Sequence, residues 1–285
     1  MLFYILKRIA LMVPTLLGAL TITFVVIQFV PGGPVEQILS QARQRSASGV
    51  YRAQGDSDAQ QIERLKKLYG FDKPASVRYV EMLSAFARFD LGTSFQQNKP
   101  VAQLIREKLP VSVSLGLWSL LLTYLVSLPL GIAKAVRDGS AFDFATSLAV
   151  LVGFAIPGFV LGVLLIVLFA GGSFFDVFPL RGLVSENWDE LSWPARVADY
   201  FWHLTLPLVC LSIGSFATST FLTKNTFIEE MRKQYVLVAR AKGLSERRVL
   251  YKHVFRNALI PIVTGFPAAF VGAFFASSLL IETMF

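Results

Sequence analysis

Eight consecutive residues in the last fifth of the chain combine charged side chains with a glycine suited to a sharp corner. They are Ala239, Arg240, Ala241, Lys242, Gly243, Leu244, Ser245 and Glu246. Cations offset the carbonyl end of a helix, glycine tolerates the left-handed position beyond it, and a following leucine can fold back on the last turn. Serine caps a new helix, and glutamate suits its first turn. The pattern predicts a helix over 226–242, a stop at Gly243 and a second helix from Glu246. Such a rigid corner could dock a partner protein, whereas a merely solvated loop explains only the charges.

Small and hydroxyl side chains recur at helical spacing in two apolar stretches. The first contains Ser112, Gly116, Ser119, Thr123 and Ser127, and the second contains Ser212, Ser215, Ser219 and Thr223. Membrane helices use such faces to pack closely and to hydrogen-bond with each other, which is the simpler interpretation. The alternative is that some of them line a polar pathway, for which the candidates are Ser112, Ser119, Thr123, Ser212 and Ser215.

Sequence patterns for catalysis or cofactor chemistry are missing from the chain. It has no GxxxxGK[ST] phosphate loop, no GxSxG and no HExxH, and its two histidines, at positions 203 and 253, stand far apart. We therefore expect no catalytic residue, no metal and no cofactor in this chain, so it should not be an enzyme. Uphill transport would need energy from another subunit.

Composition indicates an integral membrane protein. Hydrophobic residues make up 54% of the 285 residues and charged residues only 16%, whereas soluble domains are about 45–50% apolar and about 25% charged. The formal net charge of +8 comes from residues between apolar stretches rather than from a face beside stacking aromatics. That distribution argues against a nucleic-acid partner and for a lipid bilayer.

Five uncharged stretches are long enough to span a bilayer as helices, because lipid offers no partner to an open backbone. They are residues 9–30, 109–133, 144–170, 204–223 and 257–281. The fold class is therefore an all-α integral membrane protein. No charged residue falls inside these stretches, which argues against an ion-coupled carrier.

Charges between the stretches predict the topology. Residues 1–8 and 224–256 are basic, the short connection at 134–143 carries Lys134 and Arg137, and residues 171–203 are mainly acidic. The positive-inside rule then places the N-terminus in the cytoplasm. Residues 31–108 fall outside; they are charged, but loops longer than about 60 residues are exported regardless. The predicted organisation is a first helix to residue 30, a periplasmic segment over 31–108 and a transmembrane core over 109–285 with a cytoplasmic loop at 224–256.

The exported segment is expected to combine a polar stretch with two short helices. Pro31–Pro34 ends the first helix, and 41–58 is polar. Two short amphipathic helices are predicted, one carrying Ile62, Leu65, Leu68 and Tyr69, and one, after Pro74, carrying Val80, Leu83 and Phe86. A lid on the outer surface and a docking role for a partner are both compatible with this pattern.

The stretch YVLVARAKGLSERRVLYKHVFRNALIP resembles the cytoplasmic loop of membrane subunits of bacterial ATP-binding-cassette peptide importers. The family's EAA-xxx-G motif maps onto Leu237, Val238, Ala239 and Gly243, of which Ala239 and Gly243 match. Further similar segments are PGGP, GFDKP, FDLGTS, LPVSVSLG and PLGI, and GGSFFDVFPLRGL and LTKNTF are most similar to the Yej-type branch, associated with peptide and microcin C uptake.

The resemblance implies a type I importer fold with six spanning helices, five of which this sequence would supply. It also implies that the corner around Gly243 couples the permease to a cytoplasmic ATPase that binds ATP and magnesium. Further implied partners are a second, homologous permease and a periplasmic peptide-binding protein, in the bacterial inner membrane. Open alternatives are a permease for another solute such as nickel or a glycopeptide, a channel or carrier without an ATPase, and a scaffold that only docks a binding protein.

Overall fold

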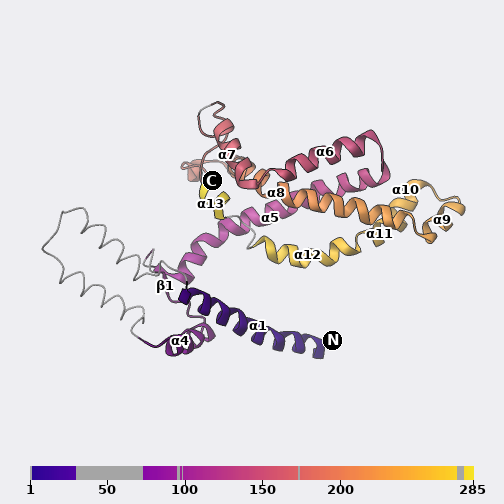
Figure 1. Ribbon diagram of the computed structural model, residues 1–285. Helices are drawn as coiled ribbons and strands as arrows, with labels where there is room; N and C mark the ends of the chain where they lie inside the picture. The colour runs from indigo at the N-terminus through magenta and orange to yellow at the C-terminus, as the bar shows by residue number, and fades with distance from the viewer. Residues whose placement is uncertain (1, 30–72, 95–96, 98, 173, 275–278) are drawn as a thin grey trace. The chain divides into compact units, whose positions relative to one another are not determined.

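The computed structural model describes residues 2–29, 73–94, 97, 99–172, 174–274 and 279–285 (Figure 1). The chain divides into two compact units, Met1–Arg106 and Glu107–Phe285. Helices dominate the described part of both units, which confirms the all-α class. The predictions made for residues 31–34, 41–58 and 62–69 lie outside the described residues.

The first unit contains two helices and a short hairpin. Its elements are α1 (Leu2–Phe29), α4 (Ala75–Ala87), β1 (Thr93–Ser94) and β2 (Lys99–Pro100), and α5 (Val101–Val136) begins in it. The strands pair antiparallel, with Thr93 opposite Pro100.

Helix α4 begins directly after Pro74, where the sequence predicts an amphipathic helix. It packs on α1 through Tyr79, whose hydroxyl lies 2.6 Å from Thr21 Oγ1 and whose ring lies 5.3 Å from that of Phe24. Of the predicted apolar face, Leu83 and Phe86 are half-buried and Val80 is exposed.

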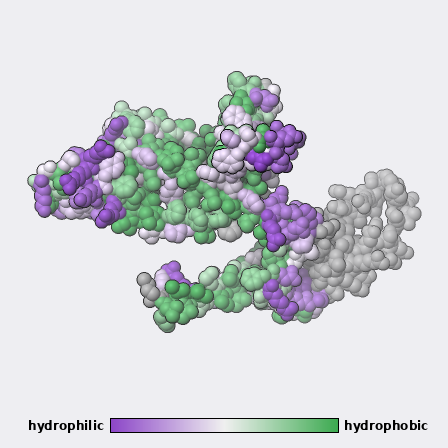
Figure 2. Space-filling view, turned by 180° about the vertical axis from the view of Figure 1, so that it is seen from behind, coloured by the Kyte–Doolittle hydropathy of each residue, from purple (hydrophilic) through white to green (hydrophobic). Residues whose placement is uncertain are grey.

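The second unit is a helical bundle that continues from α5. Its elements are α6 (Ala141–Ala155), α7 (Gly158–Phe169), η1 (Trp188–Glu190), α8 (Trp193–Met231), α9 (Gln234–Ala241), α10 (Glu246–Arg248), the π-helical η2 (Val249–Val254), α11 (Phe255–Ala258), α12 (Ile260–Ala273) and α13 (Leu279–Met284). Hydrophilic residues gather at the end of this unit that α9 and α10 form, beside a broad hydrophobic band (Figure 2).

The apolar stretches predicted from sequence correspond to up to five spans. Helices α1, α5 and α8 are each long and apolar enough to cross a membrane. Two bent pairs also qualify when each is counted as one span: α6 with α7, bent by 92°, and Glu246–Ala258 with Ile260–Ala273, bent by 47°. This agrees with five spanning segments, although two of them are not continuous helices.

The stretch at 144–170 forms two helices, α6 and α7, and the break between them lies at Pro157, one of the prolines that interrupt the apolar stretches of the sequence. Ile156, between α6 and α7, has extended backbone angles of φ −86° and ψ 119°. The ring of Pro157 disfavours the helical conformation of the preceding residue, and proline cannot donate an amide hydrogen bond. Pro14, Pro207 and Pro267, by contrast, lie inside continuous helices.

Two other predicted helices also differ from the structure. The stretch at 257–281 bends before α12, which carries Pro261 in its first turn. The helix predicted over 226–242 is interrupted, because α8 ends at Met231 and Lys233 is extended, with φ −73° and ψ 151°.

Small residues bring the helices of the second unit close together, as the stripes predict. A Cβ added to Gly131 on α5 would lie 2.6 Å from Thr223 Cβ on α8. One added to Gly116, a member of the first stripe on α5, would clash with the Ala273 carbonyl oxygen on α12. Larger residues would force these backbones apart, so close packing accounts for part of both patterns.

Candidate functional site

The corner between α9 and α10 has the backbone geometry that its sequence predicts. Gly243 has a φ of +78°. Its amide donates to the Arg240 carbonyl at 2.8 Å, and the Leu244 amide donates to the Ala239 carbonyl at 3.3 Å. These two bonds form a Schellman motif, in which a left-handed residue ends the helix and satisfies its last carbonyls. The predicted stop at Gly243 is therefore confirmed.

The restart at Glu246 is also confirmed, with one difference in its chemistry. Ser245 occupies the N-cap position with φ −60° and ψ 146°, but its side chain makes no capping hydrogen bond. Arg240 instead spans the corner: its Nε donates to Glu246 Oε1 at 2.8 Å and its terminal nitrogen to Oε2 at 3.0 Å. Paired arginine–carboxylate bonds of this kind fix orientation as well as distance.

Buried apolar side chains hold the corner on the bundle. The cluster beneath it consists of Ala135, Phe227, Val236, Ala239, Val249, Val254 and Ala258, and Leu244 packs against it. Of the predicted corner residues only Ala239 is buried, Leu244 is half-buried and the others are exposed. Leu237 and Val238 are each 52% exposed. The corner thus presents both charged and apolar atoms from a fixed backbone.

A polar cluster stabilises the break between α8 and α9. The Glu230 carboxylate, on a buried residue, accepts hydrogen bonds from the Lys233 ammonium at 2.5 Å and the Tyr235 hydroxyl at 2.6 Å. Asn257 in turn donates to the Tyr235 oxygen at 3.2 Å. Burial, together with the nearby carboxylate, raises the pKa of Tyr235 above its ordinary value, so this hydroxyl stays protonated and donates.

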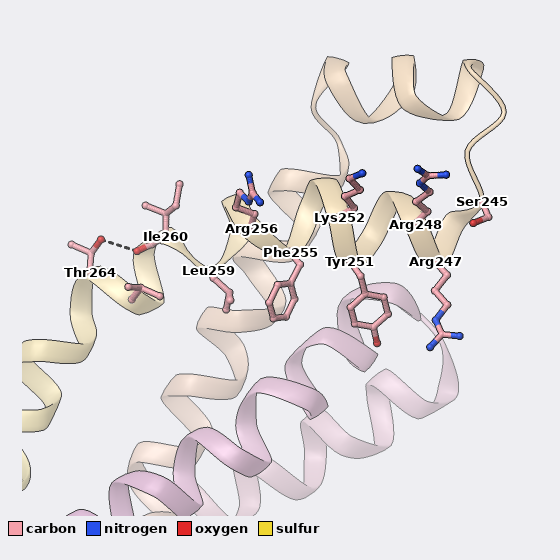
Figure 3. Close-up of a pocket in the computed structure, with 11 residues that line it drawn as sticks. Ser245, Arg247, Arg248, Tyr251, Lys252, Phe255, Arg256, Leu259, Ile260 and Thr264 are labelled. Carbon is pink, nitrogen blue, oxygen red and sulfur yellow. Dashed lines mark hydrogen bonds between the residues drawn. The ribbon is translucent and has the colours of Figure 1, made fainter.

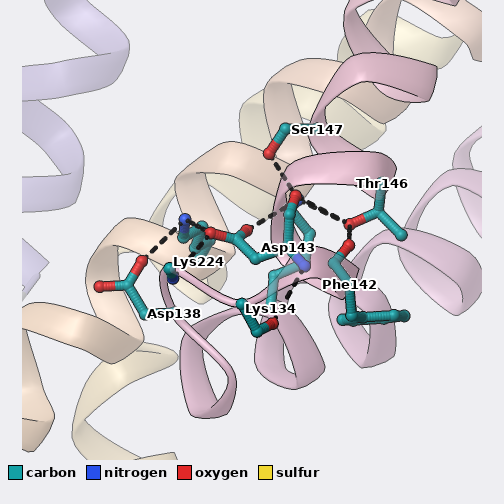
Figure 4. Close-up of polar contacts among 9 residues, drawn as sticks. Lys134, Asp138, Phe142, Asp143, Thr146, Ser147 and Lys224 are labelled. Carbon is teal, nitrogen blue, oxygen red and sulfur yellow. Dashed lines mark hydrogen bonds and ion pairs between the residues drawn. The ribbon is translucent and has the colours of Figure 1, made fainter.

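A second polar cluster, which the sequence did not predict, joins α5, α6 and α8 (Figure 4). Lys134 is fully buried, and its ammonium lies 3.0 Å from Asp143 Oδ1. It also donates to Thr146 Oγ1 at 2.9 Å and to Ser147 Oγ at 2.8 Å. Asp143 Oδ2 accepts a hydrogen bond from the Lys224 ammonium at 2.6 Å. Because a buried ion needs both a counter-ion and hydrogen bonds, these partners fix the three helices together.

One signal in the sequence could have indicated part of this cluster. Ser140 stands three residues before Asp143, the spacing of a capping box ahead of an apolar run. In the structure the Asp143 amide donates to Ser140 Oγ at 3.2 Å. Nothing in the local sequence distinguishes Lys134 from an ordinary exposed loop lysine, because its partners come from a different helix.

The structure brings some of the candidate pathway residues together around a cavity of about 500 Å³ between α5, α8 and α12. Ser119, Thr123 and Ser215 line it. So do further residues that the pathway prediction did not include, among them Tyr124, Thr218 and Ser219. Thr123 Oγ1 is buried and has no hydrogen-bond partner among the described residues.

The other two candidates do not line the cavity. Ser212 is buried and its Oγ lies 3.3 Å from Ser119 Oγ, so it supports a lining residue. Ser112 donates to the Glu282 carboxylate of α13 at 2.8 Å. The cavity is therefore lined by apolar residues and glycines together with hydroxyl groups, and none of its lining residues is charged.

The chain is similar in sequence to membrane subunits of known transport systems. The family model for the binding-protein-dependent transport system inner membrane component matches residues 127–285. The peptidoglycan transport system permease protein YejB of Agrobacterium fabrum is 55% identical over 99% of this chain and 84% of its own length. The inner membrane ABC transporter permease protein YejB of Escherichia coli O157:H7 is 48% identical over the same shares. The oligopeptide transport system permease protein AppB of Bacillus subtilis is 31% identical over 99% of this chain and 83% of its own length.

Proposed function

Because the chain belongs to the family of binding-protein-dependent transport system inner membrane components, we propose that it is a permease subunit of an ATP-driven peptide importer. The similarity to permeases of peptide transport systems, which extends over nearly the whole chain, supports peptides as the substrate class. Proteins of this family are transport subunits of the inner membrane and work with a separate ATPase and a substrate-binding protein. Hydrolysis of ATP therefore takes place outside this chain.

The coupling site in this proposal is the corner from Ala239 to Glu246. The main observation in support is that this exposed turn is rigid, because the Schellman motif at Gly243 and the Arg240–Glu246 pair fix its backbone. A partner that pushes on such a turn moves the cluster beneath it, because the packed side chains cannot yield independently. The ATPase would bind α9 through the exposed Leu237 and Val238. Movement of the ATPase would then be transmitted to α8 and α11.

The uncharged cavity is the proposed pathway through the membrane. Peptides carry many backbone donors and acceptors, and the hydroxyls of Ser119 and Ser215 can replace water around them without selecting one side chain. A second, homologous permease would supply the facing wall. The basic segments at 1–8 and 224–256 support a cytoplasmic N-terminus, with the corner on the ATPase side.

Photocrosslinking in the assembled transporter tests the coupling contact. A photoreactive phenylalanine derivative at position 237, on the exposed face of α9, should crosslink to the ATPase subunit. The same derivative at position 222 is a matched control, because Leu222 is similarly exposed at 44% but lies within α8. Crosslinks from position 222 to the ATPase, with none from position 237, would rule out the proposed contact.

A further inference from the structure

An open groove of about 1060 Å³ runs along the segment that leads from the corner into α12. Its lining changes in character along its length. Basic residues lie toward the corner: Arg247, Arg248, Lys252 and Arg256. Tyr251 and Phe255 alternate with these cations, and the aliphatic residues Leu259, Ile260 and Val263 follow toward α12. The groove therefore has an end with cations and aromatic rings and an end with aliphatic side chains.

Figure 3 shows how one helical segment presents both kinds of side chain. Arg248, Lys252 and Arg256 extend from successive turns to one side, whereas Tyr251 and Phe255 extend toward another. The π-helical turn of η2 lies between these positions, and π-turns occur often at functional sites. The arrangement offers several donors to one anion while leaving aromatic and aliphatic surface beside it.

The cations of the groove are not neutralised within the described part of the chain. None of the four forms an ion pair there, and the nearby Glu246 carboxylate is taken by Arg240. All four are exposed. Four unpaired cations on three helical turns repel one another, so an anion that sits among them is favoured.

The position of the groove along the chain indicates the kind of anion. After Arg256 no charged residue occurs before Glu282, so the groove crosses from a charged segment into one of the apolar stretches. Basic clusters placed directly at the end of a membrane helix attract anionic lipid headgroups. We infer that the groove binds an anionic phospholipid, with its phosphate among Arg248, Lys252 and Arg256 and its acyl chains along Phe255, Leu259 and Val263. The inference requires the membrane location but neither peptide transport nor the contact at Gly243.

The test measures lipid retention by native mass spectrometry of the complete transporter in detergent with added lipid. The probes are phosphatidylglycerol, phosphatidylcholine and inorganic phosphate. Wild-type protein should retain phosphatidylglycerol, and the Lys252→Gln/Arg256→Gln variant should bind it roughly 30-fold more weakly, because each cation near an anionic surface contributes about a fivefold factor. The conservative Lys252→Arg/Arg256→Lys variant should retain it.

A matched control removes two positive charges from the same end of the unit at residues that do not line the groove. Arg137 and Arg232 are exposed and do not line it, so Arg137→Gln/Arg232→Gln should leave retention unchanged. Equal retention of phosphatidylcholine, equal loss in both glutamine variants, or binding of free phosphate without lipid would each overturn the inference. So would retention by the isolated permease that disappears on assembly, since a partner subunit would then cover the groove.

Discussion

Lys134 is a charged side chain in the interior of the helical bundle. Its side chain is fully buried, and Asp143 and two hydroxyls surround its ammonium. Asp143 in turn contacts both Lys134 and Lys224, and Lys224 has a second carboxylate in Asp138, whereas Asp143 is the one carboxylate that pairs with Lys134 among the described residues. Removing it leaves one buried cation uncompensated, which is more costly than losing the pair as a whole.

We therefore expect Asp143→Asn to destabilise the protein by about 3 kcal/mol or more. Thermal unfolding of the detergent-solubilised protein, followed by circular dichroism, measures the change. Asp138→Asn is the matched control: Asp138 also contacts Lys224, at 2.9 Å, but its side chain is 44% exposed. That change should cost about 1 kcal/mol or less. Equal effects of the two substitutions would contradict the structural role given to Asp143.

Ser215 offers a test of the cavity at the same scale. Tryptophan at this position would fill much of the space between α5, α8 and α12, and we expect Ser215→Trp to lose most peptide uptake while the protein still assembles. Val209→Trp, at a 41% exposed position of the same helix outside the cavity lining, should transport normally. Uptake by the Ser215→Trp transporter at the wild-type rate would exclude this cavity as the pathway.

At the scale of helices, the break between α8 and α9 determines where the corner points. The Tyr235 hydroxyl joins Glu230 of α8 to Asn257 of α11, so α9 is attached at its base by hydrogen bonds as well as by packing. The sequence predicted one helix through this region because nothing in its apolar spacing marks Lys233 as extended. The contacts of Glu230 with Lys233 and Tyr235 outweigh the local helix preference.

Tyr235→Phe should loosen α9 without unfolding the bundle. The change leaves a buried carboxylate with one partner fewer, at a cost of about 1–3 kcal/mol, and hydrogen–deuterium exchange should rise in the amides of residues 234–241. Tyr251→Phe is a suitable control, because Tyr251 is 58% exposed and is not part of this cluster. Exchange that stays unchanged in α9 of Tyr235→Phe would show that packing alone holds the helix.

For the whole molecule, hydropathy and charge were sufficient to predict the class, the approximate spans and the corner. These features are local: an uncharged run long enough to cross lipid, or a glycine between a basic turn and a serine. Pro157 is visible in the sequence, but Pro14, Pro207 and Pro267 lie inside continuous helices, so a proline alone does not show where a helix breaks. The burial of Lys134 was not predicted, because its partners come from another helix. For the same reason the hydroxyl stripes predicted a shared face but not which of its members line the cavity.

For the transporter as a whole, we propose that ATP hydrolysis drives transport through the corner at Gly243. Gly243→Val forces a β-branched residue into a left-handed conformation, although no other atom lies within 4 Å of the added Cβ. The substitution should therefore distort the corner and leave the rest of the fold intact. Gly172→Val is the matched control, because Gly172 also has a positive φ, +66°, in open space but lies far from the corner in sequence.

The most direct test measures ATP-dependent uptake of a labelled peptide by the complete transporter reconstituted in vesicles, with either substitution. We predict that Gly243→Val lowers uptake by about tenfold or more while the subunits still assemble, because strain of about 1–2 kcal/mol distorts the contact. Gly172→Val should transport at the wild-type rate. Full uptake by a correctly assembled Gly243→Val transporter would contradict the account.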